Sequence, residues 1–282
     1  MEAGTIVTLK VVRTAPFGYF LSDGTTDVLL HAGEAKGTFE PEDEVEVYLY
    51  HDHQGRLAAT RDKPILLLEE CGWLQVTDVE FKLGAFLDNG IQKHLFLSLD
   101  DLPWDHERWP QAGDRIPVCV GVDKKGRLQA FKMDEETIKS IAEPGTETMK
   151  NNTVQGYVYK VLNSGAWLMT EGKNLAFISW DDASVPLRLG CRIEGRVTRI
   201  REDGAFGLSM LPPKEVRYVI DAEKIYEYLK SRNGKMPYTD QSDPEIIRDI
   251  FGISKGSFKK ALGKLLKENK IVQENGWTKI IK

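Results

Sequence analysis

Two six-residue stretches of this sequence follow the same pattern: Phe96-Leu97-Ser98-Leu99-Asp100-Asp101 and Phe177-Ile178-Ser179-Trp180-Asp181-Asp182. Each is preceded by a strand-like segment of Gly, Ala, an aromatic residue and Leu, at residues 84–87 and 165–168. Because both segments recur in the same order, they indicate that the chain contains copies of one structural unit.

A third copy lies near the start of the chain, where Phe17-Gly18-Tyr19-Phe20 precedes Val28-Leu29-Leu30-His31. Each copy spans about sixty residues of short β-branched and aromatic runs broken by Gly, Asp and Asn, a pattern typical of small closed barrels. We expect five-stranded barrels over residues 1–63, 64–140 and 150–213. A short helix is expected over residues 134–142, with a linker at 143–148.

After Pro212-Pro213 the hydrophobic period changes from two residues to 3.6, which indicates helices. Asp243 and Ser254 are predicted to cap the second and third of three helices, and Asn275-Gly276 is a two-residue hairpin signal. Residues 214–282 are therefore expected to form an α+β winged helix. The stripes predicted to face its core are Ala222, Ile225, Tyr226 and Leu229; Ile246, Ile247, Ile250 and Phe251; and Phe258, Ala261, Leu262, Leu265 and Leu266.

The composition is that of a soluble globular protein, with 41% hydrophobic and 29% charged residues among 282. We predict a cytoplasmic protein, because the sequence has neither a membrane-length apolar run nor a leader pattern. Cys71, Cys119 and Cys191 are expected to be reduced, buried thiols. The net charge of −5 is uneven, since residues 1–140 are acidic and residues 141–282 are net basic. We therefore expect a polyanion to be held mainly by the second half.

The first copy carries the densest group of candidate ligand-binding residues. Gly18 permits a bulge that would turn Phe17 and Phe20 to one side, and His31 on the next strand is expected beside Phe20. Asp52 and Arg56 bracket a turn that points a guanidinium towards the same surface. Aromatic faces with a nearby cation suit single-stranded nucleic acid, because bases stack and phosphates pair with the cation. The alternative is that the rings belong to the barrel core and Arg56 merely lies on an exposed turn.

The repeats resemble S1-type RNA-binding domains, which are oligonucleotide-binding (OB) barrels. In that family two aromatics of an FGAF strand, a His, and an Asp and Arg around the last turn form the RNA face. The first repeat matches all five positions. The second retains Phe86, Asp123 and Arg127, with Leu83 at the first aromatic position and Phe96 assigned to the His position. The third retains Trp167, with Ser164 and Phe177 at those two positions and Arg201 and Ala205 at the last turn.

Three S1-type domains followed by a winged helix resemble the conserved virulence factor B family of bacterial cytoplasmic proteins. That resemblance extends over almost the whole chain. It implies RNA binding and regulation of gene expression after transcription, and it does not imply catalysis.

We therefore expect single-stranded RNA, bound with low sequence specificity, over the third barrel and the third helix of the winged domain. The predicted contacts there are Trp167, Phe177, Arg188, Arg192, Arg196, Arg199, Arg201, Lys255, Lys259, Lys260 and Lys264. Those in the first two barrels are Phe17, Phe20, His31, Asp52, Arg56, Phe86, Phe96 and Arg127. Lysines grip phosphate without reading sequence.

The main alternative is a regulator that binds duplex DNA through the winged helix and uses the barrels as protein-interaction modules. A hydrolase is disfavoured because the sequence has no phosphate-binding Gly-Lys-Ser/Thr loop and no nucleophile elbow. We predict no cofactor and no metal. His51-Asp52-His53 has no third ligand nearby in the sequence, and the Asp pairs at 100–101 and 181–182 are better explained by helix capping after Ser98 and Ser179. The sequence does not specify the oligomeric state.

Overall fold

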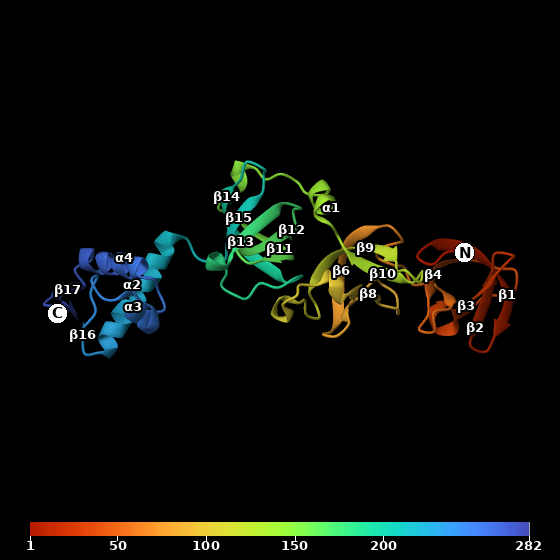
Figure 1. The fold of residues 1–282 in the computed structure, drawn as a ribbon, viewed down its shortest axis with the longest axis horizontal. Coiled ribbons are helices and arrows are strands. Elements are labelled where there is room, and N and C mark those ends of the chain that lie inside the picture. Colours follow the sequence, from red (N-terminus) through yellow and green to blue (C-terminus); the bar gives the residue numbers. More distant parts are fainter. Residues whose placement is uncertain (282) are drawn as a thin grey trace. The chain divides into compact units, whose positions relative to one another are not determined.

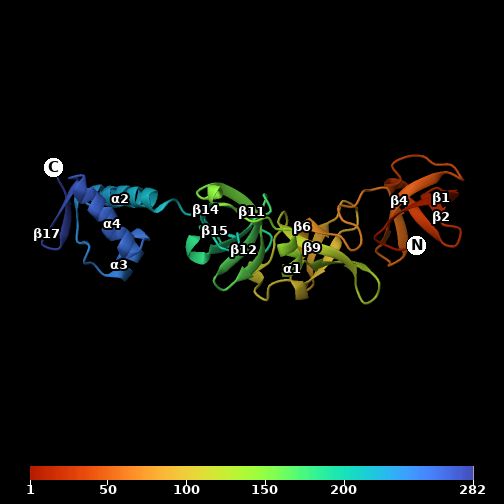
Figure 2. The ribbon, with the colours of Figure 1, turned by 90° about the horizontal axis from the view of Figure 1, so that it is seen from above.

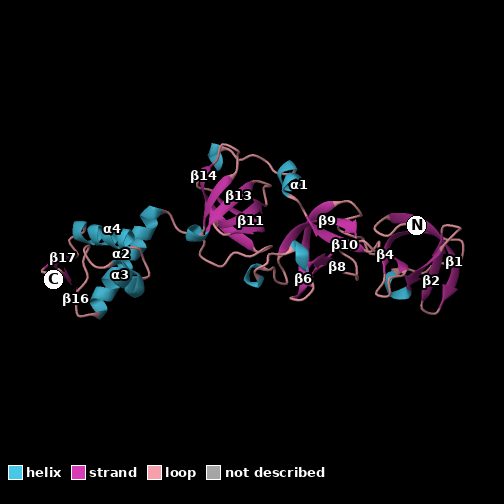
Figure 3. Cartoon of the chain, viewed as in Figure 1, coloured by secondary structure: helices cyan, strands magenta, loops and turns pink. Residues whose placement is uncertain are grey.

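The computed structural model describes residues 1–281, without the side chains of Lys214 and Glu215. It separates into two compact units, Met1–Met210 and Leu211–Lys282. The first unit contains three closed five-stranded barrels, and the second contains three helices and a small sheet (Figures 1 and 3). The predicted fold class is therefore confirmed. Within residues 1–281, no helix is both long enough and apolar enough to cross a membrane.

The first barrel closes in the strand order β1-β2-β3-β5-β4, with β3 and β5 parallel and the other neighbours antiparallel. Alternate residues face inwards, so that Leu21, Leu30 and Leu49 are fully buried in its core. Its elements are β1 (Ile6–Ala15), β2 (Gly18–Ser22), β3 (Asp27–His31), the 3₁₀ turn η1 (Ala32–Glu34), β4 (Glu44–His51) and β5 (Leu57–Thr60).

The second barrel repeats this topology in the order β10-β8-β7-β6-β9. As predicted, Ser98 caps the turn that follows β8, because its hydroxyl accepts a hydrogen bond from the Asp100 backbone N–H at 3.3 Å. The elements are β6 (Cys71–Glu80), β7 (Gly84–Asp88), β8 (Leu95–Ser98), η2 (Leu99–Asp101), η3 (His106–Arg108), β9 (Arg115–Val122) and β10 (Leu128–Lys132).

The expectation of three reduced, buried cysteines is wrong for two of them. The antiparallel pairing of β6 with β9 places Cys71 opposite Cys119, and the two form a disulfide. Cys71 is exposed and Cys119 half-buried. Their separation of 48 residues in sequence gives no sign that strand register brings them together. Cys191 is a free, buried thiol, as predicted.

The third barrel closes in the order β11-β12-β13-β15-β14. Its elements are η4 (Glu147–Met149), β11 (Thr153–Leu162), β12 (Gly165–Thr170), β13 (Leu175–Ser179), η5 (Trp180–Asp182), β14 (Arg192–Ile200) and β15 (Phe206–Ser209). Ser179 makes no capping bond to the backbone of η5, contrary to the prediction, and its hydroxyl donates to Asp182 instead.

The predicted short helix, α1 (Glu135–Ser140), joins the second barrel to the third (Figure 2). Its buried Ile138 lies in a cluster with Tyr159 and Met169 of the third barrel, and Trp73 of the second packs against it. Leu189, which precedes β14, is fully buried in the core cluster of the second barrel. The second and third barrels therefore share apolar contacts as well as a linker.

The second unit is a winged helix in which β16, β18 and β17 form the sheet. Asp243 and Ser254 cap α3 and α4 as predicted, and the hairpin turns at Asn275-Gly276. The sequence did not predict β16. It also predicted that Ile246 and Leu266 face the core, which is wrong, because they are 45% and 37% exposed. The elements are α2 (Lys214–Ser231), β16 (Lys235–Met236), α3 (Pro244–Phe251), α4 (Lys255–Lys267), β17 (Ile271–Glu274) and β18 (Trp277–Ile280).

Candidate nucleic-acid interface

Each barrel begins its second strand with a glycine at which any side chain would clash with the paired strand. Gly18, Gly84 and Gly165 have φ values of +152°, +147° and +151°. A Cβ at these positions would lie 2.2, 2.0 and 2.1 Å from a carbonyl oxygen of the paired strand. The aromatic residue two positions later faces out of the barrel, because the residues before and after it belong to the barrel core.

In the third barrel this aromatic residue lies in a row across the sheet. Strand register places Lys160, Trp167, Phe177, Gly207 and Arg199 side by side on neighbouring strands. The Trp167 and Phe177 ring centroids are 5.4 Å apart. A Cβ at Gly207 would lie 2.7 Å from Arg199 Cγ, so the arginine side chain extends over the glycine. The row is an aromatic pair with a cation at each end.

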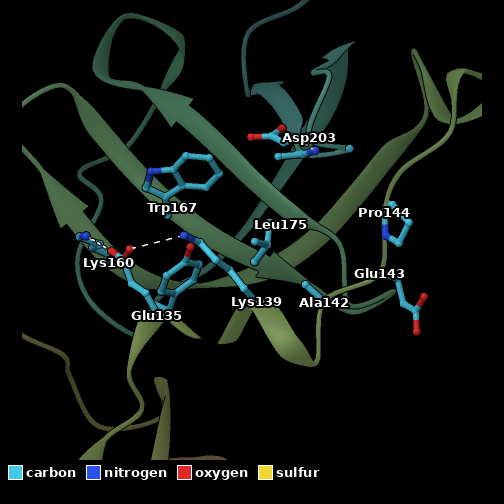
Figure 4. A pocket seen from close by; sticks show the side chains of 12 residues that line it. Glu135, Lys139, Ala142, Glu143, Pro144, Lys160, Trp167, Leu175 and Asp203 are labelled. Carbon is cyan, nitrogen blue, oxygen red and sulfur yellow. Dashed lines mark hydrogen bonds and ion pairs between the residues drawn. The ribbon is translucent and has the colours of Figure 1, made fainter. Parts of the chain in front are cut away.

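Two further features border Trp167. The Arg201 guanidinium lies 5.5 Å from its ring centroid and also forms a 3.5 Å ion pair with Asp203. A cavity of about 410 Å³ opens beside the ring. Figure 4 shows Glu135 of α1 in this cavity between Lys139 and Lys160, with ion pairs to both. The cation at one end of the row is therefore already paired with a carboxylate.

The other predicted arginines of this barrel lie away from the row. Arg188, which the sequence predicted as an RNA contact, forms an ion pair with Asp114 of the second barrel. Arg192 forms an ion pair of 2.7 Å with Glu171, and Arg196 reaches Asn151 at 3.4 Å. Arg192 precedes Arg199 by seven residues on β14, which is roughly 23 Å along a strand. The predicted arginine set is therefore dispersed.

The first barrel brings its two predicted aromatic residues together, and it gathers His31, Asp52 and Arg56 in a separate hollow. Phe17 is half-exposed, and its ring meets that of Phe20 edge-on at 6.2 Å, so both rings face one side as predicted. The bulge lies in β1 at Val12, where the register shifts, and not at Gly18. Arg13, which sequence reasoning missed, lies 3.7 Å over the Phe20 ring.

The predicted position of His31 is wrong. His31 pairs with Gly18, whereas Phe20 pairs with Leu29. The His31 ring is exposed, and its Nδ1 accepts a hydrogen bond from the Gly33 backbone N–H at 3.2 Å.

The same register corrects the other two repeats. Ser98 and Ser179 pair with Gly84 and Gly165, so they occupy the position of His31. Phe96 and Phe177 therefore correspond to Leu29 and not, as assigned from the sequence, to the His.

The turn before the last strand has the predicted form in the first two barrels. Arg56 donates from Nε and Nη2 to the Asp52 carboxylate at 2.9 and 2.8 Å, and Arg127 makes the corresponding pair with Asp123. The backbone N–H and guanidinium of Arg127 lower the pKa of Asp123 to about 2. Each arginine is thus held at the barrel surface by its own turn.

The second barrel also has an aromatic pair, but the residue at one end of its row is acidic. Phe86 and Phe96 face each other across β7 and β8 with ring centroids 5.6 Å apart. The residue that pairs with Phe86 on β6 is Asp78, where the first barrel has Arg13 and the third has Lys160. Sequence reasoning missed Asp78, Arg13 and Lys160, because only the strand register shows that each of them pairs with the aromatic residue of its barrel.

Each of the four predicted lysines of α4 has an acidic or polar partner within the winged helix. Lys259 lies 3.8 Å from Asp240 and Lys264 forms an ion pair with Glu268 at 2.5 Å. Lys260 Nζ donates to the Tyr218 hydroxyl at 2.6 Å, and Lys255 Nζ lies 3.5 Å from the Gln241 carbonyl oxygen. These acidic and polar partners therefore offset part of the positive charge that the four lysines give to the exposed face of α4.

Among residues 1–281, no three His, Cys, Asp or Glu side chains are placed to hold a metal ion. The surfaces described above are aromatic and cationic, on barrels and on a winged helix, which are architectures that bind nucleic acid. The class defined by the fold and these surfaces is a protein assembled from nucleic-acid-binding domains.

Comparison with known proteins gives the family. Models of an S1 domain, the CvfB first S1-like domain, the second domain of virulence regulatory factor CvfB and the CvfB-like winged helix domain match residues 3–62, 71–131, 138–212 and 223–280. The chain is 40% identical to YitL of Bacillus subtilis (strain 168), over 99% of this chain and 93% of YitL. It is 28% identical to conserved virulence factor B of Staphylococcus aureus (strain N315), over 97% and 92%.

The chain belongs to the conserved virulence factor B family. It is also similar to a crystal structure of a multidomain protein with nucleic acid binding domains from Streptococcus pneumoniae. That similarity has a TM-score of 0.66 and 32% identity, and covers 99% of this chain and 98% of the other.

Proposed function

We propose that this protein binds single-stranded RNA without catalysis and regulates gene expression after transcription. The RNA is held on the outer row of the third barrel and on the lysine face of α4, with no cofactor. The regulatory role is supported by the match of residues 138–212 to a domain described as belonging to a virulence regulatory factor.

The observation that carries this proposal is the row Lys160–Trp167–Phe177–Gly207–Arg199. Two adjacent rings offer stacking surfaces to successive bases, whatever the bases are, because every base has a π-face. Arg199 and Arg201 supply positive charge beside the rings, which pairs with phosphate. This arrangement favours a single strand of low sequence specificity.

The first barrel contributes weaker base stacking in this proposal. Phe17, Phe20 and Arg13 form an exposed aromatic and cationic group, but residues 1–63 carry an acidic excess that repels a polyanion. His31, Asp52 and Arg56 line a hollow of the same barrel whose lining does not include Phe17, Phe20 or Arg13. The second barrel has the pair Phe86 and Phe96 with Asp78 beside it, which disfavours a phosphate backbone there.

The alternative is a regulator that binds duplex DNA through α4, which is favoured by the winged-helix architecture itself. Two features weigh against it. The helix α4 has no arginine, the usual reader of guanine, and the hairpin residue Glu274 brings a negative charge to the wing.

The test is a fluorescence-anisotropy titration of the full chain with a labelled single-stranded RNA and with duplex DNA of the same sequence, at low and moderate salt. We expect tighter binding to RNA, weakened by salt. Trp167→Ala should lower the RNA affinity by about 5- to 160-fold, since stacking on one aromatic ring contributes about 1–3 kcal/mol.

Trp104→Ala is the matched control, because Trp104 is 87% exposed and lies outside the row. Its RNA affinity should equal that of the wild type. A preference for duplex DNA would overturn the proposal in favour of the alternative, and equal effects of the two tryptophan variants would remove the third barrel as the binding site.

A further inference from the structure

The Cys71–Cys119 disulfide lies on the outer face of the second barrel and not in its core. Leu74 on β6 and Val118 on β9 belong to the core of this barrel. Because successive residues of a strand face opposite sides, Cys71 and Cys119 face out of the barrel. The bond therefore links two outward side chains of neighbouring strands.

The two cysteines differ in their access to solvent. Cys71 is exposed, whereas Cys119 is half-buried. A disulfide is exchanged when a thiolate attacks one of its sulfur atoms, and the rate depends on access to that sulfur. An incoming thiolate can therefore reach Cys71, with Cys119 as the leaving group. Cys191, the third cysteine, is 5% exposed and belongs to the core of the third barrel, so it does not compete for the reactant.

Cys119 also packs against an apolar cluster between the second and third barrels. The buried members of this cluster are Met133, Ile138, Tyr159 and Met169. Trp73, which follows Cys71 by two residues on β6, packs against the same cluster. The Trp73 ring centroid is 5.8 Å from that of Tyr157 in the third barrel. The disulfide is therefore attached to the face through which the second barrel contacts the third.

The same cluster holds α1 and one ring of the row. Ile138 of α1 is 1% exposed within the cluster, and Trp167 packs against it. One turn earlier in α1, Glu135 forms an ion pair with Lys160, the residue that pairs with Trp167 across the sheet (Figure 4). A carboxylate in this position occupies the cation that a phosphate would otherwise bind. The cluster thus keeps Lys160 neutralised as long as it holds α1 in place.

We propose that Cys71 and Cys119 form a redox-modification site whose reactant is a low-molecular-weight thiol or its disulfide. The thiolate of the reactant attacks Cys71 Sγ, the bond between the two protein sulfurs breaks, and Cys119 leaves as a thiolate. A second reactant thiolate then displaces Cys71 from the mixed disulfide. Each protein thiolate takes up one of the protons that the two reactant thiols gave up. One protein disulfide and two thiols thus yield two protein thiols and one small disulfide, and the reverse exchange re-forms the bond.

The state of this site sets how firmly α1 is held and, through α1, the affinity of the row for RNA, a consequence that rests on the proposed function. In the disulfide form β6 and β9 are cross-linked on the face that supports the cluster, and Glu135 stays on Lys160. In the dithiol form Cys119 is free to rotate away from Cys71, so the cluster packs less tightly around Ile138. Glu135 then leaves Lys160 more often, and Lys160 becomes available to a phosphate.

The first test is a redox titration of the full chain in mixtures of reduced and oxidised glutathione. Alkylation of the native protein followed by mass spectrometry counts the thiols. We expect Cys71 and Cys119 to be labelled together in reducing mixtures and to be protected in oxidising ones, with full reversal. Cys191 should stay unlabelled because it is buried. The proposal is overturned if the bond opens only after denaturation, or if it does not re-form once it has opened.

The second test compares the two redox forms by hydrogen exchange at the Ile138 amide and by RNA anisotropy. This amide donates to the Asp134 carbonyl oxygen at the start of α1, so it reports on the helix. Reduction should speed its exchange and raise the RNA affinity by about 1.4- to 5-fold, the value of one exposed ion pair. Cys71→Ser cannot form the bond, so it should match the reduced wild type in every mixture. Glu135→Gln should bind RNA equally well in both redox forms.

Cys191→Ala is the matched control, because it removes the third thiol and leaves the pair intact, so it should keep both redox responses. A response that persists in Cys71→Ser overturns the assignment to this pair. Equal exchange at Ile138 in the two forms overturns the coupling to α1, and altered exchange with unchanged RNA affinity overturns the role given to Lys160. If neither form binds RNA, the proposed function fails, whereas the thiol count and the Ile138 exchange still decide the redox site.

Discussion

Arg188 of the third barrel binds Asp114 of the second through two parallel hydrogen bonds, from Nε at 3.1 Å and Nη2 at 3.0 Å. The Asp114 side chain is only 9% exposed, so this pair is largely desolvated. Backbone hydrogen bonds cross the same junction, from Arg115 N–H to the Gly190 carbonyl and from Leu189 N–H to the Arg108 carbonyl. The second and third barrels are therefore joined by polar and apolar contacts together.

Arg188→Ala should loosen this junction. The change leaves the Asp114 carboxylate without its main counter-charge, and hydrogen bonds to charged groups contribute about 1.5–3 kcal/mol. Hydrogen exchange at the Arg115 and Leu189 amides should speed up accordingly. Arg192→Ala is the control, since its pair with Glu171 is exposed and such pairs contribute about 0–1 kcal/mol. Equal protection of the two amides in both variants would contradict the prediction.

Charge reversal at two lysines of α4, Lys259→Glu with Lys260→Glu, should weaken RNA binding. Both side chains are exposed. For each phosphate interaction that the substitutions remove, the slope of log affinity against log salt should also fall by about 0.7. Anisotropy titrations at several salt concentrations measure both effects. Lys230→Glu on α2 is the control in the same domain, because Lys230 is paired with Glu227. An unchanged affinity in the double variant would exclude α4 from the interface.

Asp123 should make the last turn of the second barrel sensitive to acid. Hydrogen bonds from the Arg127 backbone and side chain lower its pKa from 3.8 to about 2. A carboxylate with a lowered pKa stabilises the fold above its unfolded pKa, and the contribution is lost as the pH falls from 3.8 through about 2.

The carbon-13 shift of the Asp123 carboxyl should accordingly titrate near pH 2. Asp123→Asn should destabilise the protein at neutral pH, and the difference from wild type should shrink as the pH falls towards about 2. A midpoint at the ordinary aspartate value of 3.8 would show that the turn does not hold the carboxylate.

Two glycine substitutions should have opposite effects on stability. Gly165→Ala introduces a Cβ 2.1 Å from the Ile178 carbonyl oxygen at a φ of +151°, and that backbone conformation alone costs about 1–3 kcal/mol. Gly263→Ala, on the exposed face of α4 with no atom near the new methyl group, should stabilise the winged helix by about 0.5–1 kcal/mol. Thermal unfolding of both variants is the measurement, and a stable Gly165→Ala protein would refute the backbone argument.

The cysteines should differ in reactivity. Alkylation of the denatured, unreduced protein should label Cys191 alone, because Cys71 and Cys119 are joined. After reduction all three should be labelled, and mass spectrometry counts the adducts. Three labelled residues before reduction would instead support the reduced thiols expected from the sequence.

Much of the architecture could be predicted because its signals are local. The repeated Gly-Ala-aromatic strands predict the barrels, since a glycine with positive φ and an outward aromatic are properties of a few consecutive residues. The caps at Asp243 and Ser254 and the hairpin at Asn275-Gly276 are local for the same reason. The domain limits at residues 63, 140, 150 and 213, and the RNA-binding roles of the site residues, remain predictions.

The failures concern residues that are distant in sequence. The sequence placed His31 beside Phe20, but the pairing of β2 with β3 decides which residues are neighbours. It gave no sign that Arg188 is bound to Asp114, 74 residues away. The Cys71–Cys119 disulfide likewise depends on which strands meet.

The amino-acid sequence alone determined that this protein has three barrels and a winged helix, and it left open whether the aromatic residues of the barrels face outwards or belong to the core. The barrels and the winged helix follow from the hydrophobic period of each segment, the conformation of its glycines and the capping of its helices, and each of these is set by a few consecutive residues. Only the tertiary structure decided which outward side chains are free, which are paired, and which are buried at a junction. These outcomes depend on strand register and on contacts between barrels, because charges and rings interact with their neighbours in space.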